Sequence, residues 1–234
     1  MDFSILIATM HSRNLLFQEV LREVKRQISE LPSNVRVEVI YEVDGGEMTL
    51  GAKRNLLVSR AKGKYHCFVD DDDVISPIFI KTFIPMLEDD YDCSSYVGMY
   101  YYRGNDEKHY DKLFYHSIDV SDWYETSDRF WRNVSPMNMI KTDIVRQVQY
   151  KDIRNTEDHE FAIRLAHSGL LKKEYKIPFA PVYHYIDRVK DTRYIWKYEW
   201  INNFSKLRWF IPEITTPPPP LQTFRMSNGR FRLT

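Results

Sequence analysis

The chain has 234 residues, 43% of them hydrophobic and 15% aromatic, and its 33 basic and 33 acidic residues give a net charge of zero. This length and composition favour one globular domain with a sizeable core and exclude a disordered chain. Neutrality removes the simplest electrostatic argument for a nucleic-acid or membrane partner. Because Cys67 and Cys93 lack metal or disulfide spacing, and the apolar N-terminus is too short to span a bilayer, we expect a soluble, cytoplasmic protein.

Strand and helix signals alternate through the first 70 residues. Phe3–Thr9 is a continuous apolar run, typical of a strand buried on both faces of a sheet. Apolar residues then recur at helical spacing as far as Pro32, before a second strand is predicted over residues 35–43. A helix over 53–61 and a third strand over 65–69 follow. The alternation predicts an α/β fold with a mixed, mostly parallel central sheet flanked by helices.

The second half of the chain is less regular. Its predicted elements are, in order, a helix over 78–87, two strands joined by a turn at Gly104-Asn105, a helix over 157–167, a strand within 179–185 and an aromatic-rich helix over 194–210. The run TTPPPPLQ is a polyproline break. We therefore predict a single domain over residues 1–216, followed by a Pro-rich break and tail over 217–234.

Polar residues follow three of the predicted strands, at the sheet edge where α/β proteins bind ligands. They are Thr9, Asp44 and the run Asp70–Asp73. Four adjacent carboxylates repel one another unless they are solvated, hydrogen-bonded or neutralised. Mg²⁺ and Mn²⁺ prefer such hard oxygen ligands and complete their shells with water and phosphate. A solvated loop with Asp73 capping the next helix is the alternative, but the position at a strand end favours a ligand site.

Four segments, in this order and spacing, resemble the family 2 glycosyltransferases of the GT-A fold. They are FSILIAT, YEVDGG, GAKRNLLVSRAKGKYHCFVDDDD and TEDHEFAIRLAHSG. The resemblance runs from Phe3 to about Arg188 and implies a GT-A, Rossmann-like nucleotide-diphospho-sugar transferase fold. It implies a nucleotide-sugar-binding half over residues 1–105 and an acceptor-side half over 106–216.

In that family the acidic strand end is an Asp-x-Asp motif whose last acid holds a divalent cation against the donor diphosphate. The resemblance thus implies Asp72 as a ligand of Mn²⁺ or Mg²⁺, and Asp70 near the ribose and the waters of the metal. Asp71 or Asp73 would act in support. Because four acids allow two frames, Asp70-x-Asp72 and Asp71-x-Asp73, both frames stay open.

Four more residues are implicated around the donor. The resemblance implies that Thr9 lies near the base or ribose, that Asp44 binds the uracil or ribose, and that Arg54 organises the pocket. His184 in PVYHYIDR corresponds to a late histidine that ligates the metal or contacts the diphosphate, since a neutral imidazole can act as a ligand. The alternative for His184 is an ordinary core histidine.

On the acceptor side, the resemblance implies that Asp158 is the general base of an inverting reaction, as an ionised carboxylate suits that task. Glu157 would contact a sugar hydroxyl. The alternative for this pair is that carboxylates in a first helical turn are favoured by the helix dipole. Trp131 is a candidate to stack on a sugar face and Asn138 to bind its hydroxyls; ordinary packing is the alternative.

We therefore expect a metal-dependent, inverting glycosyltransferase that moves a sugar from a nucleoside-diphosphate sugar, foremost a UDP-sugar, to a hydroxyl of a glycan or glycolipid. The compact form also resembles small viral and phage glycosyltransferases, some of which modify hydroxymethylated DNA bases in the host cytoplasm. An aromatic, mildly basic C-terminal segment could receive such a base, although the neutral charge counts against it.

Two other classes stay open. One is a non-catalytic sugar-nucleotide-binding module, against which the intact Asp72 and Asp158 argue. The other is a nucleotidyltransferase, which needs a Gly-rich basic loop after the first strand where this chain has TMHSRN.

Overall fold

The computed structural model describes residues 1–103, 109–177, 181–188, 224–227 and 230–233. The helix predicted over 194–210 and the polyproline break lie outside these residues. Two short strands of the tail, β13 (Phe224–Ser227) and β14 (Arg230–Leu233), pair antiparallel.

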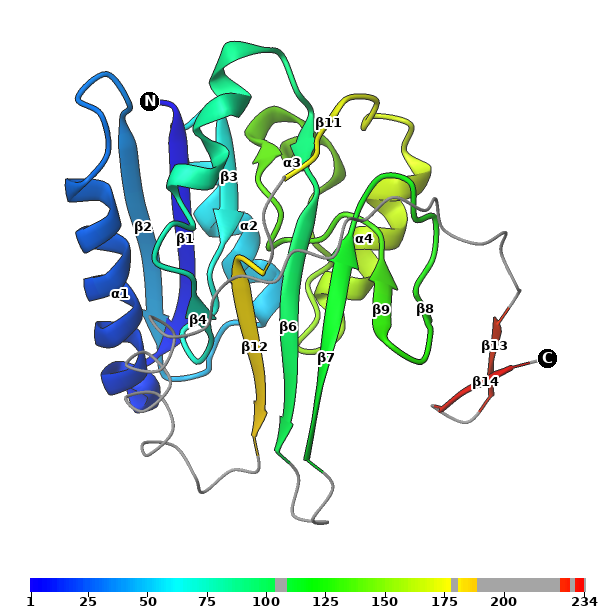
Figure 1. The fold of residues 1–234 in the computed structure, drawn as a ribbon. Helices are drawn as coiled ribbons and strands as arrows, with labels where there is room; N and C mark the ends of the chain where they lie inside the picture. Colours follow the sequence, from blue (N-terminus) through cyan, green and yellow to red (C-terminus); the bar gives the residue numbers. More distant parts are fainter. Residues whose placement is uncertain (104–108, 178–180, 189–223, 228–229, 234) are drawn as a thin grey trace.

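The predicted βαβ start of the chain forms part of the first of two six-stranded sheets (Figure 1). Strand β1 lies between β2 and β3 and is parallel to both, while β10 adds an antiparallel partner to β3. The strand order is β11-β5-β10-β3-β1-β2. The bounds are β1 Phe3–Met10, β2 Val37–Asp44, β3 Tyr65–Phe68, β5 Cys93–Ser94, β10 Ile140–Lys141 and β11 Glu174–Tyr175.

Four α-helices cover the first sheet, namely α1 Asn14–Ser29, α2 Leu50–Arg60, α3 Thr142–Val148 and α4 Glu157–His167. Two 3₁₀ helices are η1 (His11–Arg13) and η2 (Lys81–Glu88). The α-helix predicted over 78–87 is instead η2, which contains Pro85, a residue that lacks the N–H of a regular helix. Within the described part of the chain, none of the helices has the length and hydropathy needed to cross a bilayer.

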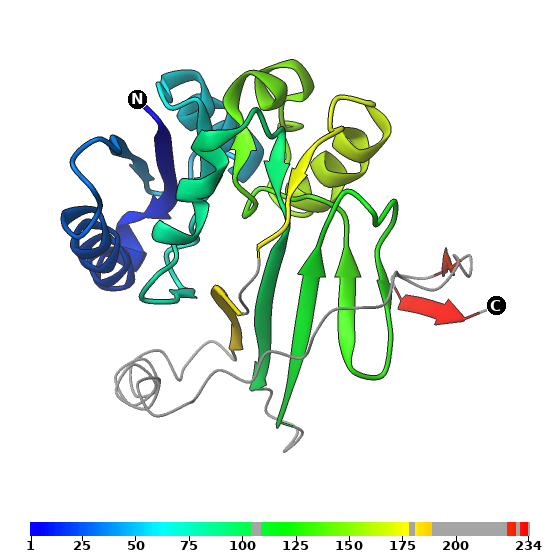
Figure 2. The ribbon, with the colours of Figure 1, turned by 45° about the horizontal axis from the view of Figure 1, so that its top comes forward.

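Alternation along β1 explains why this strand is central. Ile5 and Ile7 point into a core cluster that also holds the buried side of α1, including Phe17. Leu6 points the other way, into a second cluster with α2, α3 and α4. Figure 2 shows α2, α3 and α4 grouped together and α1 apart from them. A strand buried on both faces needs a continuous apolar run, as the sequence predicts.

The tyrosine-rich middle of the chain forms a second sheet of its own, which the sequence patterns did not separate from the first. Its order is β4-β12-β6-β7-β9-β8. The bounds are β4 Val74–Ile75, β6 Tyr96–Arg103, β7 His109–His116, β8 Tyr124–Glu125, β9 Arg129–Arg132 and β12 Tyr183–Arg188. The predicted hairpin between β6 and β7 is confirmed as an antiparallel pair. The fold class is thus mixed α/β with flanking helices, as expected.

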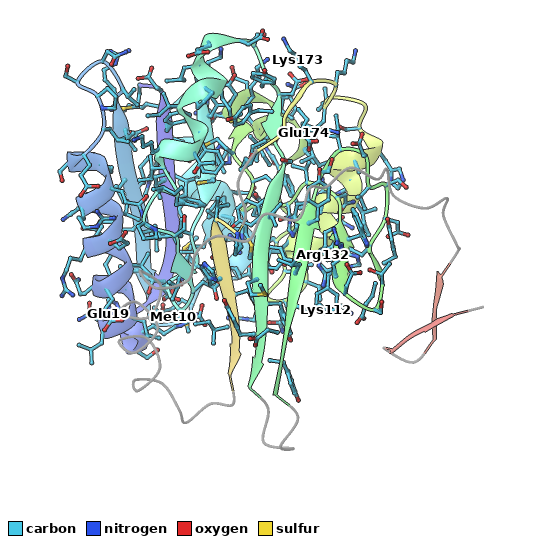
Figure 3. All side chains as sticks on the ribbon, viewed as in Figure 1. Met10, Glu19, Lys112, Arg132, Lys173 and Glu174 are labelled. Carbon is cyan, nitrogen blue, oxygen red and sulfur yellow. The ribbon has the colours of Figure 1, made fainter. Side chains whose placement is uncertain are left out.

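One half-buried carboxyl group links the two sheets. Glu174 in β11 of the first sheet accepts hydrogen bonds from the Ser117 hydroxyl (2.7 Å) and the Ile118 N–H (3.0 Å), which follow β7 of the second sheet. Figure 3 labels Glu174 at this junction. Burial raises the pKa of Glu174 to about 7, although the two hydrogen bonds oppose the shift.

A Glu174→Gln variant, which cannot ionise, isolates this carboxyl group. The folded-state pKa lies above the usual value of 4.5, so the folded protein holds the proton more tightly than the unfolded chain. We expect wild-type protein to lose stability relative to Glu174→Gln as the pH rises from about 4.5 to about 7. Urea unfolding of both proteins at pH 5 and pH 8 measures this, and a difference that stays constant would contradict it.

Candidate functional site

Three strand ends meet at one edge of the first sheet. In the parallel register Met10 at the end of β1 lies opposite Asp44 at the end of β2, and β3 runs beside β1 on the other side. The chain leaves β3 directly into Asp70–Asp73. The sequence prediction that Thr9, Asp44 and the acidic run share one edge is therefore confirmed.

The four consecutive acids alternate in direction. Asp71 and Asp73 are each 1% exposed, whereas the side chains of Asp70 and Asp72 are 27% and 41% exposed. The run thus divides into an inward pair and an outward pair, which reduces the repulsion that four neighbouring carboxylates would otherwise suffer.

Asp71 is fixed inside the protein by two partners. It accepts a hydrogen bond from the Thr9 hydroxyl (2.5 Å), and its other oxygen lies 3.1 Å from the Arg13 guanidinium. Burial raises the pKa of Asp71 to about 6, against the opposing effects of Arg13 and Thr9. Arg13 also forms an ion pair with the outward Asp72. Arg13 therefore contacts one acid of the inward pair and one acid of the outward pair.

Asp73 holds the acidic run against the second sheet. It accepts hydrogen bonds from the Tyr183 hydroxyl (2.8 Å) and the Ile186 N–H (3.2 Å), both in β12. The same Tyr183 hydroxyl accepts the N–H of Asp70 at 3.1 Å. Burial and the neighbouring Asp72 raise the pKa of Asp73 well above its usual range. Both carboxylate oxygens are thus engaged by strand β12.

Arg54 connects the acidic run with the start of α4. Its Nε donates to Glu157 (3.1 Å), its Nη2 donates to Asp70 (3.4 Å), and its guanidinium lies 4.6 Å from the centre of the Phe68 ring. Arg54 and Glu157 are both buried. Burial raises the pKa of Glu157, and burial likewise raises that of Asp70. The third nitrogen, Nη1, is buried and has no hydrogen-bond partner among the described residues.

Asp158 is next to Glu157 in the first turn of α4 and is half-buried. One of its oxygens accepts the N–H of His159 at 2.8 Å. Asp158 acts electrostatically on Asp70 and Arg54, on the donor side, and on Arg132 in β9. The two acidic motifs of the sequence, Asp70–Asp73 and Glu157-Asp158, therefore converge through Arg54.

Asp44 lies in a compact set of donors. It accepts the N–H groups of Gly46 (3.1 Å) and Met48 (3.0 Å), and the ammonium of Lys53 lies 2.5 Å away. Burial alone would raise the pKa of Asp44, but these donors outweigh it and the pKa is lowered. Lys53 also donates to the Thr9 carbonyl at 2.7 Å. Asp44 is therefore a carboxylate held in place at the strand end.

His184 is buried in β12, opposite Val74 in the strand that follows the acidic run. Its Nδ1 lies 2.9 Å from the Tyr101 hydroxyl, and burial lowers its pKa to about 3, so the ring is neutral. Across the described residues, no three His, Cys, Asp or Glu side chains are gathered as a ready metal site. His184, Asp70 and Asp72 thus do not form a preassembled set.

Two predicted residues are not brought to the site. Asn138 is 0% exposed and its amide is used internally, accepting from Ser135 N–H (2.9 Å) and donating to the Ser94 carbonyl (2.8 Å). Trp131 is 6% exposed and packs between Tyr115 and Tyr124. Their positions match the packing alternative, because hydrogen bonding and burial leave no side-chain surface for a sugar.

Two site residues were missed from the sequence. Arg13 follows β1 within TMHSRN, and Lys53 precedes Arg54 on α2. Their positions along the chain gave a signal. Arg13 comes just after a central strand and Lys53 is next to Arg54, so both are expected at the same sheet edge as the acids. Neither position has a spacing that would separate it from an ordinary surface cation.

Known proteins resemble this chain along most of its length. Uncharacterized glycosyltransferase MJ1057 of Methanocaldococcus jannaschii is 23% identical over 218 residues, covering 86% of this chain and 70% of that protein. The structure of S. aureus TarS 1–349 in complex with UDP superposes with a TM-score of 0.53 at 16% identity, covering 80% of this chain. The complex of TarS 1–349 with UDP-GlcNAc gives a TM-score of 0.53 and 83% coverage. This chain spans 61–62% of the length of those TarS chains.

The fold, with acids at the end of β3 and at the start of α4, is that of a GT-A glycosyltransferase. The profile of glycosyl transferase family 2 matches residues 11–164, which include every strand end of the site after β1 and the first turns of α4. The chain belongs to glycosyl transferase family 2.

Arg54→Leu tests the ionic link between the two acidic motifs. The change leaves Glu157 and Asp70 without their shared cation, and breaking a buried ion pair from one side costs about 3–5 kcal/mol in the free energy of unfolding. Arg60→Leu on the same helix removes an exposed pair with Glu42 and should cost about 0–1 kcal/mol. Urea unfolding measures both, and equal losses would refute the structural role of Arg54.

Proposed function

We propose that this enzyme is a metal-dependent, inverting glycosyltransferase that uses a nucleoside-diphosphate sugar, foremost a UDP-sugar, and transfers the sugar to a hydroxyl of a glycan or glycolipid. The observation that carries the proposal is the double contact of Arg54 with Asp70 and Glu157, since it holds Asp158 beside the acidic strand end. The UDP and UDP-GlcNAc complexes of the TarS neighbours support the choice of donor.

Asp44 and Thr9 are suited to the nucleoside. Asp44 is an ionised carboxylate that can accept hydrogen bonds from a base N–H or a ribose hydroxyl, and Lys53 keeps it in position. Thr9 lies at the same sheet edge, where its hydroxyl fixes Asp71. The orphaned Nη1 of Arg54 is a buried donor suited to a phosphate or sugar oxygen.

The outward acids fit a divalent cation. Asp70 and Asp72 offer two hard oxygen ligands at one strand end, and Mg²⁺ or Mn²⁺ takes one or two carboxylates together with substrate phosphates. We therefore favour the Asp70-x-Asp72 frame, in which Asp71 and Asp73 are structural. A cation held there would neutralise charge on the diphosphate leaving group. His184 stays a candidate ligand because it is neutral and lies in the strand next to the acidic run.

Asp158 is the proposed general base. Its carboxylate takes the proton of the acceptor hydroxyl as that oxygen bonds to the anomeric carbon. The bond from the anomeric carbon to the diphosphate oxygen breaks, and its electron pair leaves with the nucleoside diphosphate. Attack opposite the leaving group inverts the anomeric configuration. The hydrogen bond from Arg54 to Glu157 fixes the first turn of α4, and this fixes the position of Asp158 relative to the acidic run.

Asp158→Asn removes the base and keeps the shape of the side chain. We expect the turnover number to fall by about 10²–10⁴-fold, with donor binding retained, because general base catalysis contributes that much. The assay supplies UDP-glucose, UDP-galactose or UDP-GlcNAc, Mn²⁺ and an oligosaccharide panel, and records UDP release; NMR of the product gives the anomeric configuration. Asp143→Asn, on an exposed residue of α3, is the matched control. Unchanged turnover in Asp158→Asn, or a retained anomeric configuration, would refute this role.

Asp72→Asn and metal removal test the cation. Excess EDTA should abolish transfer, and Mn²⁺ should restore it. Asp72→Asn should raise the Mn²⁺ concentration needed for half-maximal rate and lower the rate by about 100-fold or more, since a cation supplies several kcal/mol to the leaving group. Titration of Mn²⁺ by isothermal calorimetry in the presence of UDP gives an independent measure. Full activity in EDTA would show that no metal is needed.

A further inference from the structure

The second sheet contains an arginine that the proposed chemistry does not use. Arg132 ends β9 and lies opposite His116 of β7, so it shares a sheet face with Phe130 and Lys112 (Figure 3). Its guanidinium is 3.8 Å from the centre of the Trp123 ring and 5.1 Å from that of Phe130. It is half-buried.

The aromatic support of Arg132 is rigid. The Trp123 indole N–H donates to the Asn133 side chain (2.7 Å), and Asn133 donates to the Ala162 carbonyl in α4 (3.0 Å). The Trp123 ring also lies 4.2 Å from the ring of His159, the residue after Asp158. The arginine is therefore positioned against the same helix that carries Asp158.

Arg132 differs from its neighbouring cation. Lys112, 4.6 Å from the Phe130 ring, forms an ion pair with Glu125. Arg132 forms no ion pair or side-chain hydrogen bond with any residue in the described ranges. Burial lowers the pKa of Arg132 to about 10, which still leaves it charged at neutral pH. A charged guanidinium that stacks on rings exposes its N–H edge, and that edge fits carboxylate or phosphate oxygens two at a time.

The position of Arg132 separates it from the donor. Donor residues lie at strand ends of the first sheet, whereas Arg132 is in the second sheet and its main charged neighbours are Asp158 and Glu125. Asp158 thus interacts electrostatically with both Arg54 and Arg132. A ligand bound to Arg132 would therefore be the molecule whose hydroxyl group faces Asp158, the proposed general base.

We propose that Arg132 binds a carboxylate or phosphate group carried by the acceptor, so that the acceptor is an anionic saccharide. The identification of this ligand as the acceptor rests on the proposed function. A saccharide fits better than a nucleic acid because a polyanion needs a row of cations. On the described part of this sheet face, Arg132 is a single cation without an ion pair, and the net charge of the chain is zero.

Binding of three small saccharides tests the proposal. Glucuronic acid supplies a carboxylate, glucose 6-phosphate a phosphate, and glucose no charge. With UDP and Mn²⁺ present, NMR titration should give Kd values at least about 10-fold lower for one or both anionic sugars than for glucose. Which anion binds more tightly identifies the group. Equal Kd values for all three would overturn the proposal.

Substitutions locate the effect. Arg132→Gln should remove the preference for the anionic sugars. Arg132→Lys keeps the charge but lacks the paired N–H donors of the guanidinium, so it should retain only part of the preference. Arg129→Gln is the matched control, since Arg129 lies on the opposite face of β9 and pairs with Asp128. Urea midpoints confirm that each variant is folded. A preference that survives in Arg132→Gln would overturn the assignment.

Two further readouts separate the possible failures. Release of UDP from UDP-sugars without any acceptor reports on the proposed function alone. An anionic preference without UDP release would refute the glycosyltransfer while keeping the binding site; UDP release without the preference would refute only the role of Arg132. A ten-nucleotide single-stranded DNA that displaces glucuronic acid in a salt-sensitive manner would assign the site to nucleic acid and overturn the proposal.

Discussion

The buried guanidinium of Arg54 is the constraint on which the site depends. A charge taken out of water must be compensated, and Arg54 is compensated by one acid from the end of β3 and another from the start of α4. Both acids must stay near it, so two segments that lie about 90 residues apart in the chain are held at a fixed separation. The ring of Phe68 beneath the guanidinium limits its movement further. The relative position of the end of β3 and the start of α4 thus depends on one buried arginine.

The acidic run shows how a strand end can carry four carboxylates. Alternation sends Asp71 and Asp73 inward and leaves Asp70 and Asp72 facing out. Asp71 accepts a hydrogen bond from a hydroxyl and pairs with an arginine, and Asp73 accepts a hydrogen bond from a backbone N–H of β12. The inward pair therefore fixes the direction of the outward pair.

Much of this could be predicted from the sequence. Continuous apolar runs predicted β1 and β3, and the alternation of strands and helices predicted the fold class. The position of polar residues at strand ends predicted that Asp44 and the acidic run share one sheet edge. The failures have physical causes. Asn138 and Trp131 were expected at the site because their side chains suit sugars, but a side-chain type does not report whether the residue is buried in the fold. The second sheet was missed because β12 joins it from about 80 residues beyond β6, and pairing at that distance leaves no local pattern.

The bonds from Asp73 to Tyr183 and Ile186 span 110 and 113 positions of the chain. During synthesis the acidic run leaves the ribosome long before β12 exists to orient it. Until then, the groups that orient Asp73 are missing, and the edge where β1, β2 and β3 end cannot take its final shape. This edge is therefore completed by contacts of long sequence separation, and closing a loop of that length costs conformational entropy.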